Sequence, residues 1–256
     1  MSAAAMPLAL VTGGHRRLGA RIAMGLARAG YALAIHGRHD AEPHPFLAEC
    51  LAETGVPWAG FVADFLEPGS AETLVPAIAA HFGRAPDLLV NSASLFGQDR
   101  LDSVTGDELA DHFAVNASAP ILLTRSFARA ERPAEADACI VNLLDQRLAQ
   151  PHGDQLAYTV SKYALAGFTR IAARELAPRV RVNAVAPGLT LATEDYGAEQ
   201  LALLGQAMPL QALPEPEDVA RAVLYLAGAR AVTGQTIHVD AGAHMRSYPR
   251  DFMHLG

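Results

Sequence analysis

Cysteine is nearly absent from this 256-residue sequence, in which Cys50 and Cys139 are the only two. Two cysteines so far apart predict neither a disulfide framework nor the C-x-x-C spacing of a zinc site. The ten histidines form no H-x-x-x-H or H-x-E array. We therefore predict no structural metal.

Blocks of Lys or Arg are also missing, and the formal net charge is -7. Such a chain lacks the positive patch through which proteins bind nucleic acid or anionic membranes. No apolar stretch is long enough to span a bilayer, and residues 1–5 do not resemble an export signal. The sequence thus predicts a soluble, cytoplasmic protein that acts on a small molecule.

Hydrophobic residues, by contrast, make up 51% of the chain, which suits a sheet buried on both faces. Strand-length apolar runs lie at 8–11, 32–35, 58–63, 88–91, 139–143, 180–185 and 235–239, with long helical patterns at 107–130 and 155–176. This alternation predicts βαβ units with right-handed crossovers. We expect one domain over 1–256, a doubly wound (Rossmann) three-layer α/β fold with a seven-stranded parallel sheet.

A glycine-containing turn, Thr12–Gly19, separates the first strand from the first helical pattern. A dinucleotide site needs small residues there, so that the backbone can approach a pyrophosphate at the helix N-terminus. Gly13 would allow the tight turn, and Gly19 would let the helix pack close to the strand. The spacing departs from G-x-G-x-x-G, so purely structural glycines are the alternative. The strand–turn–helix context favours cofactor binding.

Charges near this turn favour NADPH over NADH. NAD sites usually place Asp or Glu at the end of the second strand to bind the ribose 2′-OH. Here that strand ends in His36 and Arg38, both of which we expect to contact the cofactor, with no acid before Asp40. Arg16, Arg17 and Arg38 instead supply positive charge suited to a 2′-phosphate, which guanidinium groups bind through paired donors. Solvated surface arginines are the alternative.

Tyr158 and Lys162 lie four residues apart near the start of a helical pattern, so they share a helix face. A nearby ammonium stabilises phenolate, which predicts a Tyr158 pKa lowered toward the working pH and a usable acid. The Y-x-x-x-K spacing is common by chance, so a structural pair is the alternative. Its place after a strand that should end beside the cofactor favours catalysis.

Together these features resemble the short-chain dehydrogenase/reductase family along essentially the whole chain. The resemblance implies that the Thr12–Gly19 turn, with Leu18 before its last glycine, binds the cofactor, and that Asp64 contacts the adenine. Asn91-Ser92-Ala93-Ser94 stands where the family has N-N-A-G, so Ser92 and Ser94 are departures.

The same resemblance implies the catalytic set. Asn116 matches the family's structural and proton-relay Asn, and Tyr158 and Lys162 match its active-site pair. The segment Pro187-Gly188-Leu189-Thr190 matches the loop that covers the nicotinamide amide, which implies cofactor contacts from Pro187, Gly188 and Thr190.

One position departs from the family in an informative way. The substrate-orienting Ser normally lies thirteen residues before the Tyr, and Asp145 occupies that position. An ionised carboxylate accepts hydrogen bonds but cannot donate one to a substrate carbonyl. Its charge would also raise the Tyr158 pKa, opposing Lys162. A substrate rich in N–H donors, or one that becomes a cationic imine, would suit it better.

This replacement is similar to the pteridine reductase and dihydromonapterin reductase branch, as are Ser94, Phe96 and Thr190. By resemblance, Phe96 would stack on a pterin ring, while Ser94, Asp145 and Tyr158 would contact the substrate. A non-catalytic polar residue at 145 and loop packing of Phe96 are the alternatives. The resemblance implies NADPH-dependent reduction of a C=N bond in a dihydropterin or similar heterocycle.

Two other functions stay open at this point. The first is a general carbonyl or 3-ketoacyl reductase in which Asp145 is incidental. The second is a non-catalytic NADPH-binding regulator, against which the intact Asn116, Tyr158 and Lys162 argue. The family resemblance further implies a homotetramer with the 107–130 and 155–176 helices at an interface. Residues 190–212 are expected to form the substrate lid.

Overall fold

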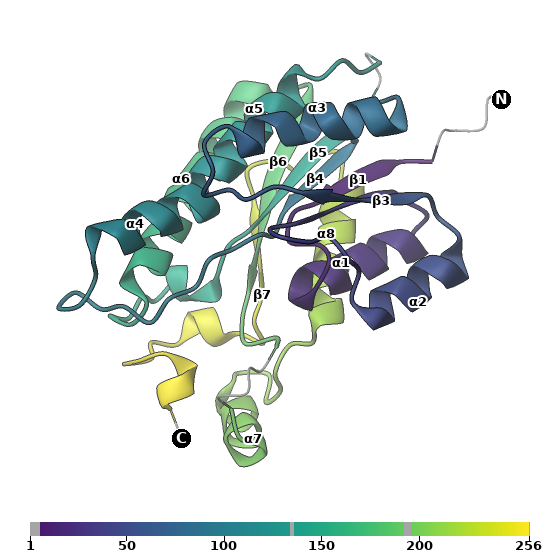
Figure 1. The fold of residues 1–256 in the computed structure, drawn as a ribbon. Coiled ribbons are helices and arrows are strands. Elements are labelled where there is room, and N and C mark those ends of the chain that lie inside the picture. The colour runs from purple at the N-terminus through teal and green to yellow at the C-terminus, as the bar shows by residue number, and fades with distance from the viewer. Residues whose placement is uncertain (1–5, 134–135, 192–195, 256) are drawn as a thin grey trace.

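A seven-stranded parallel sheet lies at the centre of the computed structural model, which describes residues 6–133, 136–191 and 196–255 (Figure 1). The strand order is β3-β2-β1-β4-β5-β6-β7. The strands are β1 (Leu8–Val11), β2 (Ala32–Gly37), β3 (Trp58–Val62), β4 (Leu88–Asn91), β5 (Ala138–Leu143), β6 (Val180–Pro187) and β7 (Thr236–Val239). The order confirms the doubly wound Rossmann fold.

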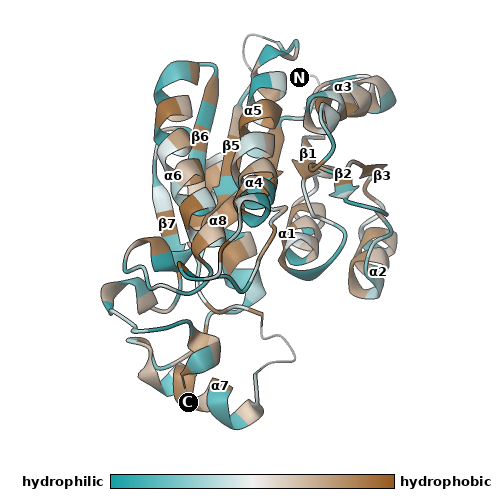
Figure 2. Ribbon diagram, turned by 60° about the vertical axis from the view of Figure 1, so that its left-hand side comes forward, coloured by the Kyte–Doolittle hydropathy of each residue, from teal (hydrophilic) through white to brown (hydrophobic). Residues whose placement is uncertain are grey.

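Helices cover both faces of this sheet (Figure 1). One face carries α1 (Arg17–Arg28), α2 (Pro45–Thr54) and α8 (Pro216–Gly228), and the other carries α3 (Ser70–Phe82), α5 (Ala119–Arg129) and α6 (Leu156–Leu176). Alternate residues of one strand point to opposite faces, so Ala9 and Val11 join the first core whereas Leu8 and Leu10 join the second. Figure 2 shows hydrophobic colouring on the central strands β1 and β5. The apolar strand runs therefore supply two cores at once.

All seven predicted strands are present, and β2 and β6 each run two residues further than predicted. The helix predicted over 107–130 is divided into α4 (Gly106–Phe113), a π-helical turn (Ala114–Ser118) and α5. Pro120 has no N–H to donate to the carbonyl four residues earlier, and this loss permits the wider turn. Asn116 lies within that turn.

A smaller layer lies beyond the carboxyl edge of the sheet, where α7 (Ala198–Ala207) and the C-terminal end come together in both views (Figures 1 and 2). Its core contains Leu204, Met208, Ala243 and Phe252. The predicted lid over 190–212 overlaps α7, although residues 192–195 fall outside the described residues. Across the described residues, no helix has the length and apolar character needed to cross a membrane.

Candidate active site

The carboxyl ends of the central strands meet where the strand order reverses, between β1 and β4. Ligands of open α/β sheets bind in the crevice at such a point. The residues that follow β1, β4, β5 and β6 at this edge contain most of the predicted site. Contacts between neighbouring loops hold them together.

The first of these loops is the turn between β1 and α1. Gly13 has a positive φ of 62°, and a Cβ there would lie 3.1 Å from Ala93 Cα. A Cβ on Gly19 would lie 2.2 Å from the Gly13 carbonyl oxygen, which only glycine avoids. Leu18 packs against the core cluster on the α1 side of the sheet. The turn therefore leaves open backbone at the start of α1, as a pyrophosphate site requires.

His36, predicted to contact the cofactor, is buried beneath this turn. Its Nδ1 accepts a hydrogen bond from Gly13 N–H at 3.1 Å, and its Nε2 lies 2.8 Å from the Ala63 carbonyl oxygen. The ring stacks on Phe65 with centroids 4.4 Å apart. Burial lowers the pKa of His36 to about 4, so the neutral ring can accept at Nδ1. His36 thus holds the turn in shape from below.

The three arginines expected at the 2′-phosphate have different settings. Arg16 and Arg17 are exposed at the start of α1. Arg38 is also exposed, and its Nε donates to Asp64 Oδ2 at 2.9 Å. Arg38, predicted to bind the 2′-phosphate, and Asp64, predicted to contact the adenine, therefore form an ion pair with each other.

The segment after β4 is tied to its two neighbouring strands. Thr12 Oγ1 accepts hydrogen bonds from the N–H groups of Ser92 and Ala93, both at 3.0 Å. Asn91 Nδ2 donates to Asn142 Oδ1 at 2.8 Å. Thr12 lies in the predicted turn, but its role as a clamp on Ser92 and Ala93 was not predicted. The clamp fixes the start of the β4 loop beside the turn that follows β1.

Asn116 connects the β4 loop to α6. Its Oδ1 accepts from Leu95 N–H at 2.7 Å and from the Ser94 hydroxyl at 3.2 Å. Its Nδ2 donates to Ser161 Oγ at 3.0 Å, and Ser161 donates to the Tyr158 carbonyl oxygen at 2.7 Å. The amide is fully buried. A buried amide with every bond satisfied sets the distance between these two elements.

Four predicted substrate residues gather at the start of α6. The Tyr158 hydroxyl donates to Asp145 Oδ2 at 2.9 Å. The Phe96 ring meets the Tyr158 ring edge-on, with centroids 4.8 Å apart, and is 48% exposed. Ser94 is exposed on the same loop as Phe96. An accessible aromatic face therefore lies beside a tyrosine–carboxylate pair.

The pKa of Tyr158 agrees with one part of the prediction and differs from another. Burial raises the pKa of Tyr158 well above its ordinary value, and the charge of Asp145 raises it further, while Arg147 acts in the opposite direction. The predicted effect of Asp145 is thus confirmed. The prediction that Lys162 brings the Tyr158 pKa down is wrong, because burial and the carboxylate raise this pKa and the cation that opposes them is Arg147. Tyr158 holds its proton firmly.

Lys162 is buried behind Tyr158, with its Nζ 5.6 Å from the Tyr158 ring centroid. The ammonium donates to the Leu143 carbonyl oxygen at 2.8 Å. Burial lowers the pKa of Lys162 to about 8, with Asp145 acting in the opposite direction. Lys162 therefore titrates within the pH range of ordinary enzyme assays.

At the end of β6, Gly188 N–H donates to the Val239 carbonyl oxygen at 2.9 Å. A Cβ on Gly188 would lie 2.8 Å from Asp240, so the chain needs glycine here. Pro187 is buried as the last residue of β6, and Thr190 is partly exposed three residues later. This segment leaves the sheet next to β5, which leads directly to Asp145.

Comparison with known proteins shows the family to which this chain belongs. The family model described as "Enoyl-(Acyl carrier protein) reductase" matches residues 14–244. The chain is 35% identical to 3-oxoacyl-(acyl-carrier-protein) reductase FabG of Pseudomonas aeruginosa over 244 residues, which cover 93% of this chain and 97% of the relative. The chain belongs to the short-chain dehydrogenase/reductase family.

Other members of the short-chain dehydrogenase/reductase family match equally long stretches. Pteridine reductase 1 of Leishmania tarentolae is 32% identical over 277 residues, covering 92% of this chain and 96% of the relative. The structure of FolM alternative dihydrofolate reductase 1 from Brucella canis, complexed with NADP, superposes with a TM-score of 0.85 at 35% identity. That match covers 94% of this chain and 95% of the other.

Arg147 is the main feature of this short-chain dehydrogenase/reductase site that sequence reasoning missed. Asp145 Oδ1 accepts the Arg147 backbone N–H at 2.9 Å, in a single helical turn over Gln146–Leu148. The guanidinium carbon lies 5.2 Å from the Tyr158 ring centroid and 5.6 Å from that of Phe96. The Asp-x-Arg spacing after β5 was the available signal. A sequence alone does not show that an arginine is buried.

We expect Lys162 to lose its proton near pH 8. Lys162 is the only lysine in the sequence, so protein labelled with carbon-13 at lysine Cε gives a single lysine signal. Because the pKa is lowered, the ammonium persists below about pH 8 and is lost above it. The kcat/KM of the free enzyme should fall over the same range.

The carbon-13 titration and the rate profile should therefore share a midpoint, with circular dichroism confirming that the fold persists. A midpoint near the ordinary value of 10.5 would contradict the burial of this charge.

Proposed function

We propose that this protein is an NADPH-dependent reductase of a C=N bond in a dihydropterin or a closely similar heterocycle. The observation that carries the proposal is the 2.9 Å hydrogen bond from the Tyr158 hydroxyl to Asp145, beside the exposed ring of Phe96. A carboxylate there favours a substrate that donates hydrogen bonds, and a flat ring favours a planar one. Similarity to pteridine reductase 1 and to FolM adds support.

The residues present fit NADPH. Gly13 and Gly19 leave the backbone at the start of α1 bare, since a Cβ on Gly13 would meet Ala93 and one on Gly19 would meet the Gly13 carbonyl. Arg16, Arg17 and Arg38 supply exposed positive charge beside it. The Brucella FolM structures of similar sequence are NADP complexes. The start of α1 would hold the pyrophosphate, and the arginines the 2′-phosphate.

NADPH supplies the hydride, and the chain's own residues manage the proton and the geometry. Tyr158, which keeps its proton at neutral pH, donates that proton to the substrate nitrogen as the adjacent carbon is reduced. Asp145 accepts substrate N–H groups and orients the ring, while Phe96 stacks on its face. Lys162 stabilises the resulting phenolate and would hold the cofactor ribose. Solvent then returns the proton to Tyr158 through the polar groups around Asn116.

Transfer of deuterium tests this reaction directly. NADPH carrying two deuterium atoms at nicotinamide C4 is incubated with protein and a dihydropterin, and the product is analysed by mass spectrometry. We expect a tetrahydropterin that has gained one carbon-bound deuterium. A product without deuterium, or an unchanged dihydropterin, would rule out direct hydride transfer to this substrate class.

Arg38 should set the preference for NADPH. Replacing it by alanine (Arg38→Ala) removes a charged hydrogen bond to the 2′-phosphate, a loss of about 1.5–3 kcal/mol, which corresponds to a roughly 10- to 100-fold weaker NADPH affinity. NADH affinity, measured in parallel by fluorescence titration, should change little because NADH lacks that phosphate. Equal losses for both cofactors would show that Arg38 only supports the fold or Asp64.

Reduction of a ketone is the second candidate, and the similarity to FabG of Pseudomonas aeruginosa is the observation that favours it. In that case Asp145 would be incidental to substrate choice. The family chemistry of Tyr158 and Lys162 would be the same, so only the substrate separates the two functions.

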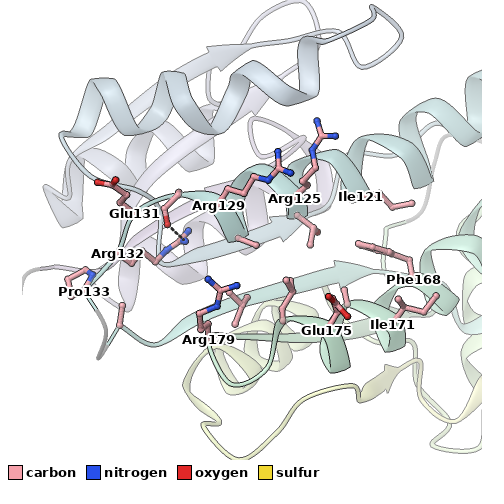
Figure 3. Close-up of a pocket in the computed structure, with 17 residues that line it drawn as sticks. Ile121, Arg125, Arg129, Glu131, Arg132, Pro133, Phe168, Ile171, Glu175 and Arg179 are labelled. Atoms are coloured by element: carbon pink, nitrogen blue, oxygen red, sulfur yellow. Dashed lines mark hydrogen bonds between the residues drawn. The ribbon is translucent and has the colours of Figure 1, made fainter.

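A second copy of the chain is the proposed occupant of a groove between α5 and α6. The groove encloses about 750 Å³ and has a largely apolar lining that includes Ile121, Phe168 and Ile171, of which Ile171 is 67% exposed (Figure 3). Glu175 and Arg129 both border it, so a two-fold contact that pairs each with the other on the second copy would join opposite charges. No predicted site residue lines this groove. We propose that this face joins subunits of a homotetramer.

Burying a carboxylate at that contact should break it. We expect Ile171→Glu to shift the protein from a four-chain to a smaller species in sedimentation analysis, because the interface would then enclose an unpaired charge. Leu101→Glu, at an equally apolar but loop-borne exposed position, is the control and should leave the assembly unchanged. A wild-type protein that sediments as a monomer would contradict the proposal.

A further inference from the structure

Arg147 carries a positive charge into the interior beside the reacting groups, and its side chain is only 7% exposed. Its Nη2 donates to Asp251 Oδ2 and its Nη1 to Gln155 Oε1, each at 2.7 Å. Its Nε lies further from Asp145 Oδ1, at 3.4 Å. A buried guanidinium is tolerated only when acceptors surround it. The strongest of these acceptors, Asp251, comes from the far end of the chain.

Asp251 belongs to the C-terminal tail, which we define as residues 246–255. The tail is anchored next to α6, because Asp251 N–H donates to Asp154 Oδ2 at 2.9 Å and Arg250 Nη2 lies 3.1 Å from Asp154 Oδ1. Burial raises the pKa of Asp154, but Arg250 and the Asp251 N–H outweigh it and lower the pKa to about 2. Asp154 is therefore a charged anchor at neutral pH.

The tail is also fixed to α7. Phe252 packs in one cluster with Leu204 and Met208, at and just after the end of α7. Gln200 Nε2, within α7, donates to the Leu255 carbonyl oxygen at 2.8 Å. The segment that carries Asp251 is therefore held from both sides, by Asp154 and by α7.

The competition between two carboxylates for Arg147 has a consequence for Tyr158. One oxygen of Asp145 accepts the Tyr158 hydroxyl, and the other faces Arg147. Because Asp251 holds the guanidinium more closely, Asp145 keeps an oxygen free for Tyr158. Without the Asp251 charge, the guanidinium would turn fully onto Asp145 and draw that carboxylate away from the hydroxyl.

We propose that the C-terminal tail positions the reacting groups: Asp251 restrains Arg147, and Arg147 in turn fixes Asp145 against the Tyr158 hydroxyl. Both Asp251 and Arg147 are positioning residues, since neither is required to touch the substrate. The inference rests on the proposed function only in that Tyr158 and Asp145 perform the chemistry. It holds for whichever substrate the enzyme reduces.

Charged and titratable groups face Asp145 from each of the elements packed around it. They are Arg147 of the same loop, His152 of the following loop, Tyr158 and Lys162 of α6, and Asp251 of the tail. Burial lowers the pKa of His152, which is therefore neutral at pH 7. Arg147 is then the nearest fixed positive charge that the tail can control.

A double-mutant cycle tests whether Asp251 acts through Arg147. Asp251→Asn keeps an acceptor of the same shape and removes only the charge. We expect it to lower kcat roughly tenfold without changing KM for NADPH, since small misplacements of reacting groups have effects of at least this size. In an Arg147→Gln background the same substitution should change kcat by less than about twofold, because the guanidinium through which Asp251 acts is absent.

The signal of the single lysine gives a readout that needs no turnover. Asp145 raises the pKa of Lys162, so the carbon-13 midpoint of Lys162 reports the charge on Asp145. Asp251→Asn should lower this midpoint, and should lower it measurably less when Arg147 is already Gln. The Lys162 titration needs no substrate, and the double-mutant cycle can also be measured with a ketone. Both tests therefore remain valid if the enzyme does not reduce pterins.

Arg181→Gln is the matched structural control. Arg181 is also buried, and it binds Asp137 at 2.9 Å from the opposite end of the sheet. Its replacement should lower the thermal midpoint while leaving kcat and the Lys162 signal unchanged. Equal effects of Asp251→Asn in both backgrounds would overturn the proposal. If Arg147→Gln does not fold, Asp251→Asn alone decides: a fall in kcat at constant KM supports the proposal, and an unchanged kcat refutes it.

Discussion

Replacing Tyr158 with phenylalanine should reduce kcat by about 1000-fold, because the variant has no proton to give to the substrate nitrogen. The ring and its contact with Phe96 would remain, so substrate and NADPH should still bind. The measurement is steady-state NADPH oxidation, combined with a fluorescence titration of NADPH affinity.

The chain contains a matched control for this substitution. Tyr163 lies on the same helix, and its hydroxyl donates to the Leu148 carbonyl oxygen at 2.7 Å. Tyr163→Phe should therefore lose a hydrogen bond of similar length with little effect on turnover. Normal turnover by Tyr158→Phe would show that the proton comes from another group.

The second large effect is expected at Asp145. Asp145→Ser should lower kcat/KM for a dihydropterin by about 100-fold, since a charged acceptor that faces the substrate N–H groups is lost. Ketone reduction should be unchanged or improved, because a serine hydroxyl can donate to a carbonyl oxygen. The ratio of the two kcat/KM values is the quantity to follow.

This ratio separates specificity from damage to the fold. Asp137→Ser, which disturbs the distant pair with Arg181, should lower stability and leave the ratio unchanged. A parallel loss on both substrates in Asp145→Ser would mean that the carboxylate supports Tyr158 without selecting the substrate. No loss on the dihydropterin would make Asp145 incidental.

The fold was largely predictable because its central strands are buried on both faces. Runs such as Leu8–Val11 and Leu88–Asn91 are short, apolar and bounded by turn residues, and each formed a strand with those bounds. The edge strand β3 was also found, one residue shorter than predicted, although its residues alternate between exposed and partly buried. The π-helical turn was missed because helical periodicity hides a single extra residue, although Pro120 was a visible signal.

The site was predictable where its residues are close in sequence. Tyr158 and Lys162 share one helix, and the glycines of the first turn lie within one loop. His36 was predicted to contact the cofactor, but its burial beneath the turn, which depends on packing against Phe65, was not predicted. A further signal was not used in the prediction. Lys162 is the only lysine in a chain rich in arginine, which indicates a position that arginine cannot fill.

The contact between Arg147 and Asp251 had no comparable signal. The two residues are 104 positions apart, and both belong to types that usually lie in solvent. Their burial follows from where the tail settles on α7 and Asp154, which depends on the complete fold. Local pattern therefore indicated the predicted reacting groups, and only the structure shows the buried pair of Arg147 and Asp251 beside them.

We propose that Asp145 makes this enzyme a reductase of dihydropterins. The most direct test is NADPH oxidation by the purified wild-type protein, with dihydromonapterin, dihydrobiopterin and a panel of small ketones measured side by side. We predict a kcat/KM for the pterins at least tenfold above that for any ketone. Faster turnover of the ketones would contradict the claim, while leaving the fold and the Tyr158–Lys162 chemistry in place.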